Sequence, residues 1–173
     1  MIKMIYSDAA GNKKYWETWQ DGLTVIVHHG LVGETGEVDK HAAGNDPEAM
    51  MSRFADEAKN EGYGPLIDDA LVTFVVQYQI DGFGTEQDLR KRHDIEDELN
   101  EALGWSGNGN CDGGDIGSGS MNVWCYVVDP EIATRTVKAT LSGRGYLDGA
   151  TIAYEADDEY VVVHPRGGEF HIL

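Results

Sequence analysis

Leu71-Val72-Thr73-Phe74-Val75-Val76-Gln77-Tyr78 predicts a strand, and the interpretation of the longer part of the chain starts from it. The stretch is rich in β-branched and aromatic residues, which fit a buried pleated surface. Thr85-Glu86-Gln87-Asp88 follows shortly afterwards and has the form of a capping box with Asp in place of Glu. A helix is therefore predicted from this box to Leu103, where Gly104 ends it.

The pattern continues downstream with further elements of both kinds. These are a glycine-rich stretch over 106–120, a strand over 121–128, a helix that begins at Asp129-Pro130-Glu131 and runs to about Leu141, and a hairpin of strands 150–154 and 160–164. This order favours a ferredoxin-like sandwich over residues 70–173, with two helices on one face of an antiparallel sheet. The match requires a short edge strand within the glycine-rich stretch.

Residues 1–67 predict a smaller domain of strands and one helix. Alternating segments occur at 1–6, 15–19, 23–28 and 37–41. Asp46-Pro47-Glu48 then supplies a cap, a first-turn proline and an acid, which together predict the start of a helix that ends at Gly62. Because Pro65 cannot continue a helix, the chain breaks there, and we place the domain boundary in the segment that follows, through Asp68-Asp69. The predicted fold class is α+β, with this small antiparallel sheet before the ferredoxin-like domain.

The net charge limits the classes of molecule that the protein is expected to bind. The chain has 173 residues, with 31 Asp and Glu against 13 Lys and Arg, which gives a formal charge of −18. Affinity for nucleic acid comes largely from cations that displace counterions, so binding to a phosphate backbone is not expected. An acidic surface attracts basic proteins instead, and it raises their association rates. Negative charge that merely maintains solubility is the alternative interpretation.

Two further features bear on the cellular compartment. The sequence has no run of 18 or more apolar residues, and its start lacks the apolar segment of a signal peptide. The cysteines, Cys111 and Cys125, are too few for a disulfide framework. A bridge between them requires the flanking strands to pair, and we expect two reduced thiols. A cytoplasmic protein that does not contact a membrane is therefore expected.

Residues from about 13 to 66 resemble a WGR domain, a module of strands and one helix found in poly(ADP-ribose) polymerases and in many bacterial proteins. The resemblance lies in Tyr15-Trp16-Glu17, in the strand after it, and in His29-Gly30-Leu31-Val32-Gly33-Glu34-Thr35-Gly36. A capped helix that ends at Glu61-Gly62-Tyr63 also fits the family. The resemblance covers roughly the first third of the chain and implies a small sheet with one helix.

The triplet that gives the family its name is altered here. In place of Trp-Gly-Arg the chain has His29, Gly30 and Leu31. In the polymerases this region helps to contact DNA and a neighbouring domain. Leucine in place of arginine removes the planar guanidinium group that binds phosphate. Together with the net charge, the resemblance implies that the DNA-binding role is lost and that the module is a scaffold or a protein-binding surface.

The helix predicted over 85–103 carries the most suggestive surface. Asp94, Asp97, Glu98 and Glu101 lie within two turns. An apolar row lies opposite them and contains Ile95, Leu99 and Ala102. Such an acidic face is a candidate docking surface for a basic partner, although a solvated helix face has the same composition.

The glycine-rich stretch offers a second, less specific candidate, because Asp112 and Asp115 could act as acid and base in an enzyme. The run that starts at Asn108 resembles the opening of a calcium loop, but its twelfth position is Gly119 instead of glutamate. The histidines show no metal-ligand spacing. We therefore expect no metal, no cofactor and no enzymatic activity.

The function predicted from the sequence is a non-catalytic, acidic protein-binding module, such as an immunity or inhibitor protein for a basic partner. A WGR-type nucleic-acid-associated protein is the first alternative. An enzyme that uses the carboxylates of Asp112 and Asp115 is the second.

Overall fold

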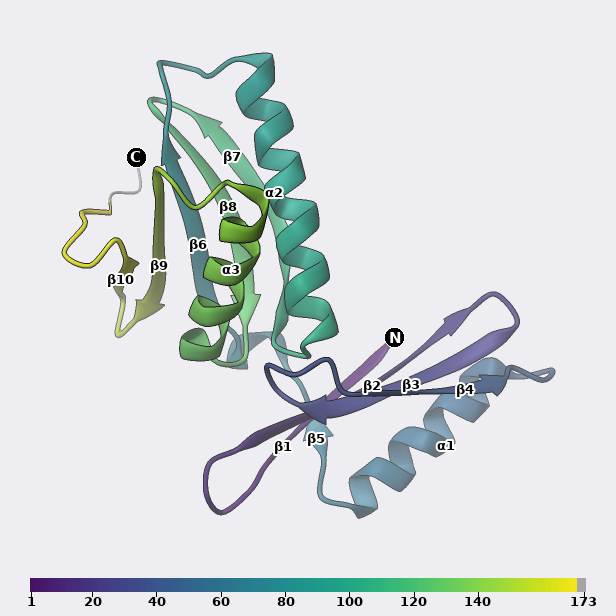
Figure 1. The fold of residues 1–173 in the computed structure, drawn as a ribbon. Coiled ribbons are helices and arrows are strands. Elements are labelled where there is room, and N and C mark those ends of the chain that lie inside the picture. The colour runs from purple at the N-terminus through teal and green to yellow at the C-terminus, as the bar shows by residue number, and fades with distance from the viewer. Residues whose placement is uncertain (171–173) are drawn as a thin grey trace. The chain divides into compact units, whose positions relative to one another are not determined.

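The computed structural model describes residues 1–170, so the last three residues of the predicted second domain lie outside the described part. The chain divides into two compact units. The first contains Met1–Ala70 and Trp105–Gly107, and the second contains Leu71–Gly104 and the residues from Asn108 onward. Each unit has its own five-stranded antiparallel sheet (Figure 1). The fold class is therefore α+β, as the sequence predicts.

The first unit is a sheet with one helix along one of its faces (Figure 1). Its elements are β1 (Ile2–Ser7), β2 (Lys13–Asp21), β3 (Thr24–Leu31), β4 (Glu37–Ala42), α1 (Pro47–Asn60), β5 (Gly64–Pro65) and a short 3-10 helix, Asp68–Ala70. The sheet order is β4-β3-β2-β1-β5. An Asp-Gly hairpin joins β2 to β3, where Gly22 takes a positive φ of 56° and Asp21 pairs with Thr24.

Helix α1 begins where the capping signal predicts. The Asp46 carboxylate accepts a hydrogen bond from the Ala49 amide at 2.9 Å, and Pro47 takes the first helical position. Ala55 and Ala58 are buried against the sheet, where Met4, Trp16 and Val27 complete a small apolar core. The small alanine side chains let α1 lie close to the strands.

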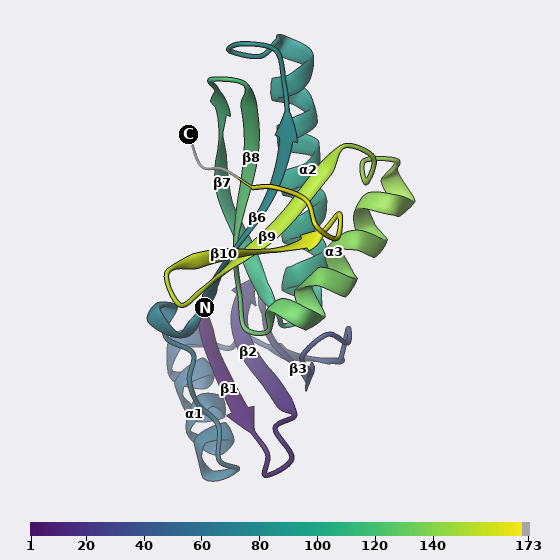
Figure 2. The same ribbon diagram turned by 90° about the vertical axis from the view of Figure 1, so that its left-hand side faces the viewer.

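The second unit has ferredoxin-like topology. Its elements are β6 (Val72–Gln79), α2 (Glu86–Trp105), β7 (Gly109–Gly117), β8 (Ser120–Val127), α3 (Pro130–Arg144), β9 (Ala150–Ala156) and β10 (Glu159–His164). The sheet order is β10-β9-β6-β8-β7, so β10 adds a fifth strand at one edge, next to β9 (Figure 2). The outer edge on the other side is β7.

Both helices of the second unit cover the same face of its sheet. Leu99 of α2 and Val137 of α3 belong to one buried cluster together with Phe74 of β6 and Val123 of β8. The capping box that starts α2 forms as predicted, because Thr85 and Asp88 exchange side-chain to backbone hydrogen bonds. Among the described residues, no helix is both long and apolar enough to cross a membrane.

The glycine-rich stretch differs from its predicted form. In place of a long loop with a short edge strand it forms the nine-residue strand β7, which pairs with β8 and has a register irregularity between Cys111 and Gly114. The backbone at Gly109 shows why this strand requires glycine. Its φ is +143°, and a Cβ at this position would lie 2.0 Å from the Tyr126 carbonyl oxygen. Glycine thus allows a close backbone approach, whereas its low strand propensity predicts a loop.

Candidate functional site

The triplet His29-Gly30-Leu31 lies at the end of β3, and its three residues have different surroundings. Gly30 packs tightly, since a Cβ there would come within 2.7 Å of the Gly36 Cα. The Leu31 side chain is exposed. His29 is half-buried, and its Nε2 lies 3.4 Å from the Asp39 Oδ2 on β4. His29 also pairs across the sheet with Trp16 of β2. His29 is therefore the member of the triplet that lines a cavity.

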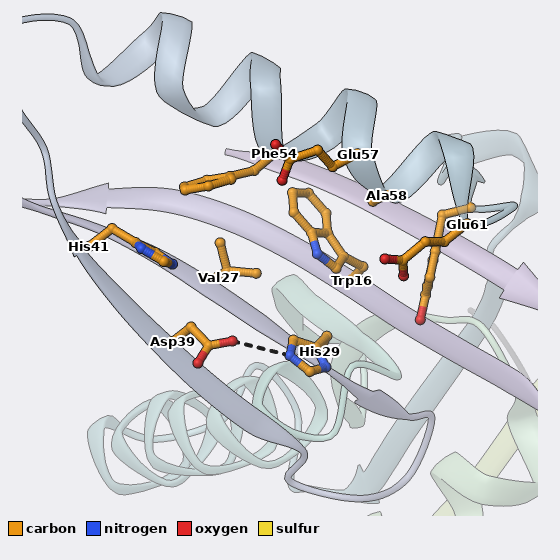
Figure 3. Close-up of a pocket in the computed structure, with 10 residues that line it drawn as sticks. Trp16, Val27, His29, Asp39, His41, Phe54, Glu57, Ala58 and Glu61 are labelled. Atoms are coloured by element: carbon orange, nitrogen blue, oxygen red, sulfur yellow. Dashed lines mark hydrogen bonds and ion pairs between the residues drawn. The ribbon is translucent and has the colours of Figure 1, made fainter.

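This cavity lies between α1 and the sheet of the first unit and has a volume of about 340 Å³. It is open to solvent and combines aromatic, acidic and imidazole side chains (Figure 3). The residues that line it are Trp16, Val27, His29, Asp39, His41, Phe54, Glu57, Ala58, Glu61 and Tyr63. We call it the α1 pocket.

Aromatic rings form much of the wall of the α1 pocket. The Trp16 side chain is largely covered by the helix, and 8% of the residue remains exposed. The Phe54 ring lies 4.7 Å from the His41 imidazole, centroid to centroid. Burial, and then the nearby Glu61 carboxylate, raises the pKa of Tyr63. These rings offer π-faces that favour a cation near them.

Carboxylates border the same pocket. Glu57 and Glu61 follow one another by one helical turn at the end of α1, and their carboxylates flank the Trp16 indole (Figure 3). Glu57 lies 3.9 Å from the Arg53 Nε, in an exposed pair that contributes little to stability. Within the described part of the chain, the Glu61 carboxylate forms no ion pair. The pocket therefore has negative charge that the chain does not fully neutralise.

The Trp16 indole nitrogen faces into the pocket, on the side of Val27 and His29 (Figure 3). Although the residue is more than nine-tenths buried, its N–H donates no hydrogen bond to any residue between 1 and 170. The nitrogen itself is reached by solvent in the pocket, because no fully buried side-chain nitrogen among the described residues lacks a hydrogen-bond partner. This donor is therefore available to a ligand in the pocket.

The neighbouring histidine has a different role. His28 is fully buried on the other face of the strand from His29. Its Nδ1 lies 2.8 Å from the Glu17 Oε1, and its Nε2 lies 2.6 Å from the Thr35 carbonyl oxygen. The Nε2 also lies 2.8 Å from the Tyr15 hydroxyl, so both ring nitrogens have polar partners. The Tyr15 hydroxyl donates to the same Thr35 carbonyl at 2.9 Å. His28 is therefore held in a structural network.

Tyr15 gives this network a pH dependence. Burial, followed by the charges of Glu17 and Glu34, raises the pKa of Tyr15 to about 12. An unfolded tyrosine ionises near 10, so the contribution of Tyr15 to stability is present below about pH 10 and is lost as the pH rises toward 12. We expect Tyr15→Phe to flatten this part of the stability profile of the first unit. Urea unfolding followed across this range for both proteins checks it, and parallel profiles would contradict it.

The acidic face predicted on the second unit is present on α2. Asp97 and Glu98 lie three and four residues after Asp94, and Glu101 lies four and three residues after them, which places the four on one stripe of the helix. Asp94 accepts a hydrogen bond from the Tyr146 hydroxyl at 3.3 Å, and Glu98 pairs with Arg144. Asp97 and Glu101 are exposed and have no cationic partner among the residues that the structure describes.

The other acidic candidates lie on β7. Asp115 accepts hydrogen bonds from the Asn122 side chain at 2.7 Å and from the Trp124 indole at 2.6 Å. Asp112 is exposed on the same strand. Asp115 thus joins β7 to β8, which gives it a structural role in the sheet.

The two cysteines are direct neighbours on paired strands, Cys111 on β7 and Cys125 on β8. Both are free thiols. A hydrogen bond with Cys111, together with burial, raises the pKa of Cys125 well above its usual value. The Cys125 thiol therefore stays protonated, which disfavours a nucleophilic role.

The sequence singled out His29 but missed the rest of the α1 pocket. Trp16 is buried, as an aromatic residue in a hairpin strand usually is, so its residue type does not indicate a pocket. The spacing of Phe54, Glu57 and Glu61 along one helix was the available signal. Over residues 1–170, no group of three or more His, Cys, Asp and Glu side chains could hold a metal ion. Compared with protein-family models, curated proteins and solved structures, the chain matches none.

Proposed function

We propose that this chain is a non-catalytic protein that binds a basic protein partner, in the manner of an immunity or inhibitor protein. The proposal rests on the ion pairs that the few Lys and Arg side chains form within the chain. At least six of the thirteen Lys and Arg residues already lie within 4 Å of a carboxylate of the same chain: Lys3, Arg53, Lys59, Arg90, Arg92 and Arg144. The excess of Asp and Glu side chains over Lys and Arg is therefore available to a basic partner.

The acidic stripe of α2 is the surface that we propose for the main contact. Its carboxylates lie on a rigid helix, so they are pre-oriented, and Asp97 and Glu101 are exposed. Charges of this kind steer association and confer specificity, and their effect falls as salt rises. The WGR-like interpretation of residues 13–66 belongs to the same proposal, with the first unit as a scaffold or second contact surface.

Nucleic-acid binding through the first unit has less support. Of the cations in that unit, Lys3 lies 3.8 Å from Glu17, Arg53 lies 3.9 Å from Glu57 and Lys59 lies 2.7 Å from Asp56. Cations that are already paired with carboxylates contribute less to phosphate binding.

The stripe is tested by neutralising three of its acids. We expect D94N/D97N/E101Q to weaken binding to the basic partner about tenfold at low salt, because three steering charges are lost. The control, D157N/D158N/E159Q, removes the same charge from the turn between β9 and β10 and from the first residue of β10. The partner is captured from a lysate of the source organism treated with DNase, at low and high salt, and affinities are then measured with the purified protein.

A single basic protein, retained at low salt and released at high salt, fits the proposal. Recovery of nothing above background, or only of DNA-associated proteins that disappear after DNase treatment, contradicts it. If both triple variants weaken binding equally, the contact is non-specific charge attraction and the α2 stripe is not the docking surface.

A further inference from the structure

The α1 pocket of the first unit has features that a plain acidic patch lacks. It is a formed cavity, and its walls bring together π-faces, carboxylates and one free indole donor. Trp16, Glu57 and Glu61 lie together near the C-terminal end of α1, with the two carboxylates on either side of the indole (Figure 3). These groups place three kinds of interaction within reach of one small ligand.

Each group restricts the chemistry of that ligand. Aromatic faces and carboxylates both favour a cation. The Trp16 N–H can only donate, so a ligand that uses it also carries an oxygen acceptor. An amino-acid residue with a basic side chain has both, because its own backbone carbonyl supplies the acceptor.

The chain itself indicates which basic side chain suits this wall. The Arg53 guanidinium lies 5.1 Å above the Phe54 ring and beside the Glu57 carboxylate at the rim of the pocket. A guanidinium can stack on a ring and bind carboxylates with its remaining donors at the same time, which a lysine ammonium does less well. Glu61 is not engaged by Arg53 and is left for a second guanidinium.

We infer that the α1 pocket binds one arginine side chain of a basic protein partner. The guanidinium lies against the aromatic wall and pairs with the Glu61 carboxylate, and the backbone carbonyl of the same residue accepts a hydrogen bond from the Trp16 indole N–H. This inference rests on the proposed function, because it names the group of the basic partner that the first unit recognises. It assigns His29, the altered triplet residue, to the wall of that pocket.

A small probe tests the pocket without the partner. The probe is N-acetyl-L-arginine N-methylamide, and binding is followed through the indole N–H signal of Trp16 in ¹H–¹⁵N spectra. We expect a saturable shift of this signal. The citrulline counterpart has the same shape and carbonyl but no charge, so it should leave the signal in place. The lysine counterpart should bind more weakly than arginine.

Matched variants separate the pocket from general charge attraction. Glu61→Gln should weaken binding of the arginine probe about fivefold, since one charge-assisted contact is lost. Glu48→Gln removes the same charge from the other end of α1 and should leave the affinity unchanged. Both substitutions are at exposed positions, so the fold is retained.

The inference is overturned if the Trp16 signal does not move, if citrulline or lysine binds as well as arginine, or if both variants weaken binding equally. Its failure is distinguishable from failure of the proposed function. The probe reports on the first unit alone, whereas the D94N/D97N/E101Q experiment reports on α2 and the whole partner. A partner that binds through α2 while the probe does not bind refutes only the pocket.

Discussion

Replacing His28 by leucine is expected to destabilise the first unit by about 1–3 kcal/mol, because the change removes the hydrogen-bond partner of a buried carboxylate. The Glu17 carboxylate would lose its 2.8 Å contact with the His28 Nδ1 while remaining mostly buried. The Thr35 carbonyl would lose its contact with the His28 Nε2 and keep the Tyr15 hydroxyl as a donor. Lys3, at 3.8 Å from the Glu17 Oε2, is too exposed to compensate fully.

The adjacent residue provides the control for this prediction. His29→Leu changes the same residue type on the same strand, but at a half-buried position whose contact with Asp39 is long. We expect it to cost less than about 1 kcal/mol. Hydrogen exchange of the strand amides, read residue by residue, gives the stability of each unit separately. Equal losses for the two variants would show that the His28 network does not stabilise the unit.

A second large effect is expected in the second unit. Leu99 of α2 is fully buried against the sheet, and Leu99→Ala should lower the free energy of unfolding by about 2–5 kcal/mol through lost apolar contacts and the cavity left behind. Leu89→Ala, near the start of the same helix, is the matched control, because Leu89 is 39% exposed. Its cost should be below about 1 kcal/mol. Urea unfolding monitored by circular dichroism compares them, and a loss for Leu89→Ala as large as for Leu99→Ala would contradict the packing assigned to α2.

Most of the architecture follows from local signals in the sequence. Asp46 and Pro47 mark the start of α1, and Thr85 with Asp88 marks the start of α2, because caps and prolines act within a few residues. Asp129 caps α3 in the same way, with its carboxylate accepting from the Ile132 amide at 3.0 Å. Such interactions are encoded in short segments, so the sequence alone predicts them.

The features that sequence reasoning missed depend on contacts between distant residues. β7 is stabilised by its pairing with β8, and its glycines lower the local tendency to form a strand. β5 consists of Gly64 and Pro65, which predict only a chain break, yet they pair with Ile5 and Met4 of β1. The α1 pocket likewise requires the Trp16 and His29 register and the docking of α1. None of these can be read from a short window.

The composition of β7 also has a consequence for self-association. This strand is an outer edge of its sheet, and an edge strand with unpaired backbone groups can template pairing with another chain. Glycine weakens such pairing, the irregularity between Cys111 and Gly114 interrupts a continuous ladder, and the exposed carboxylates of Asp112 and Asp115 would repel the same edge of a second copy. The residues that lower the strand propensity of β7 thus also protect the protein against edge-to-edge aggregation.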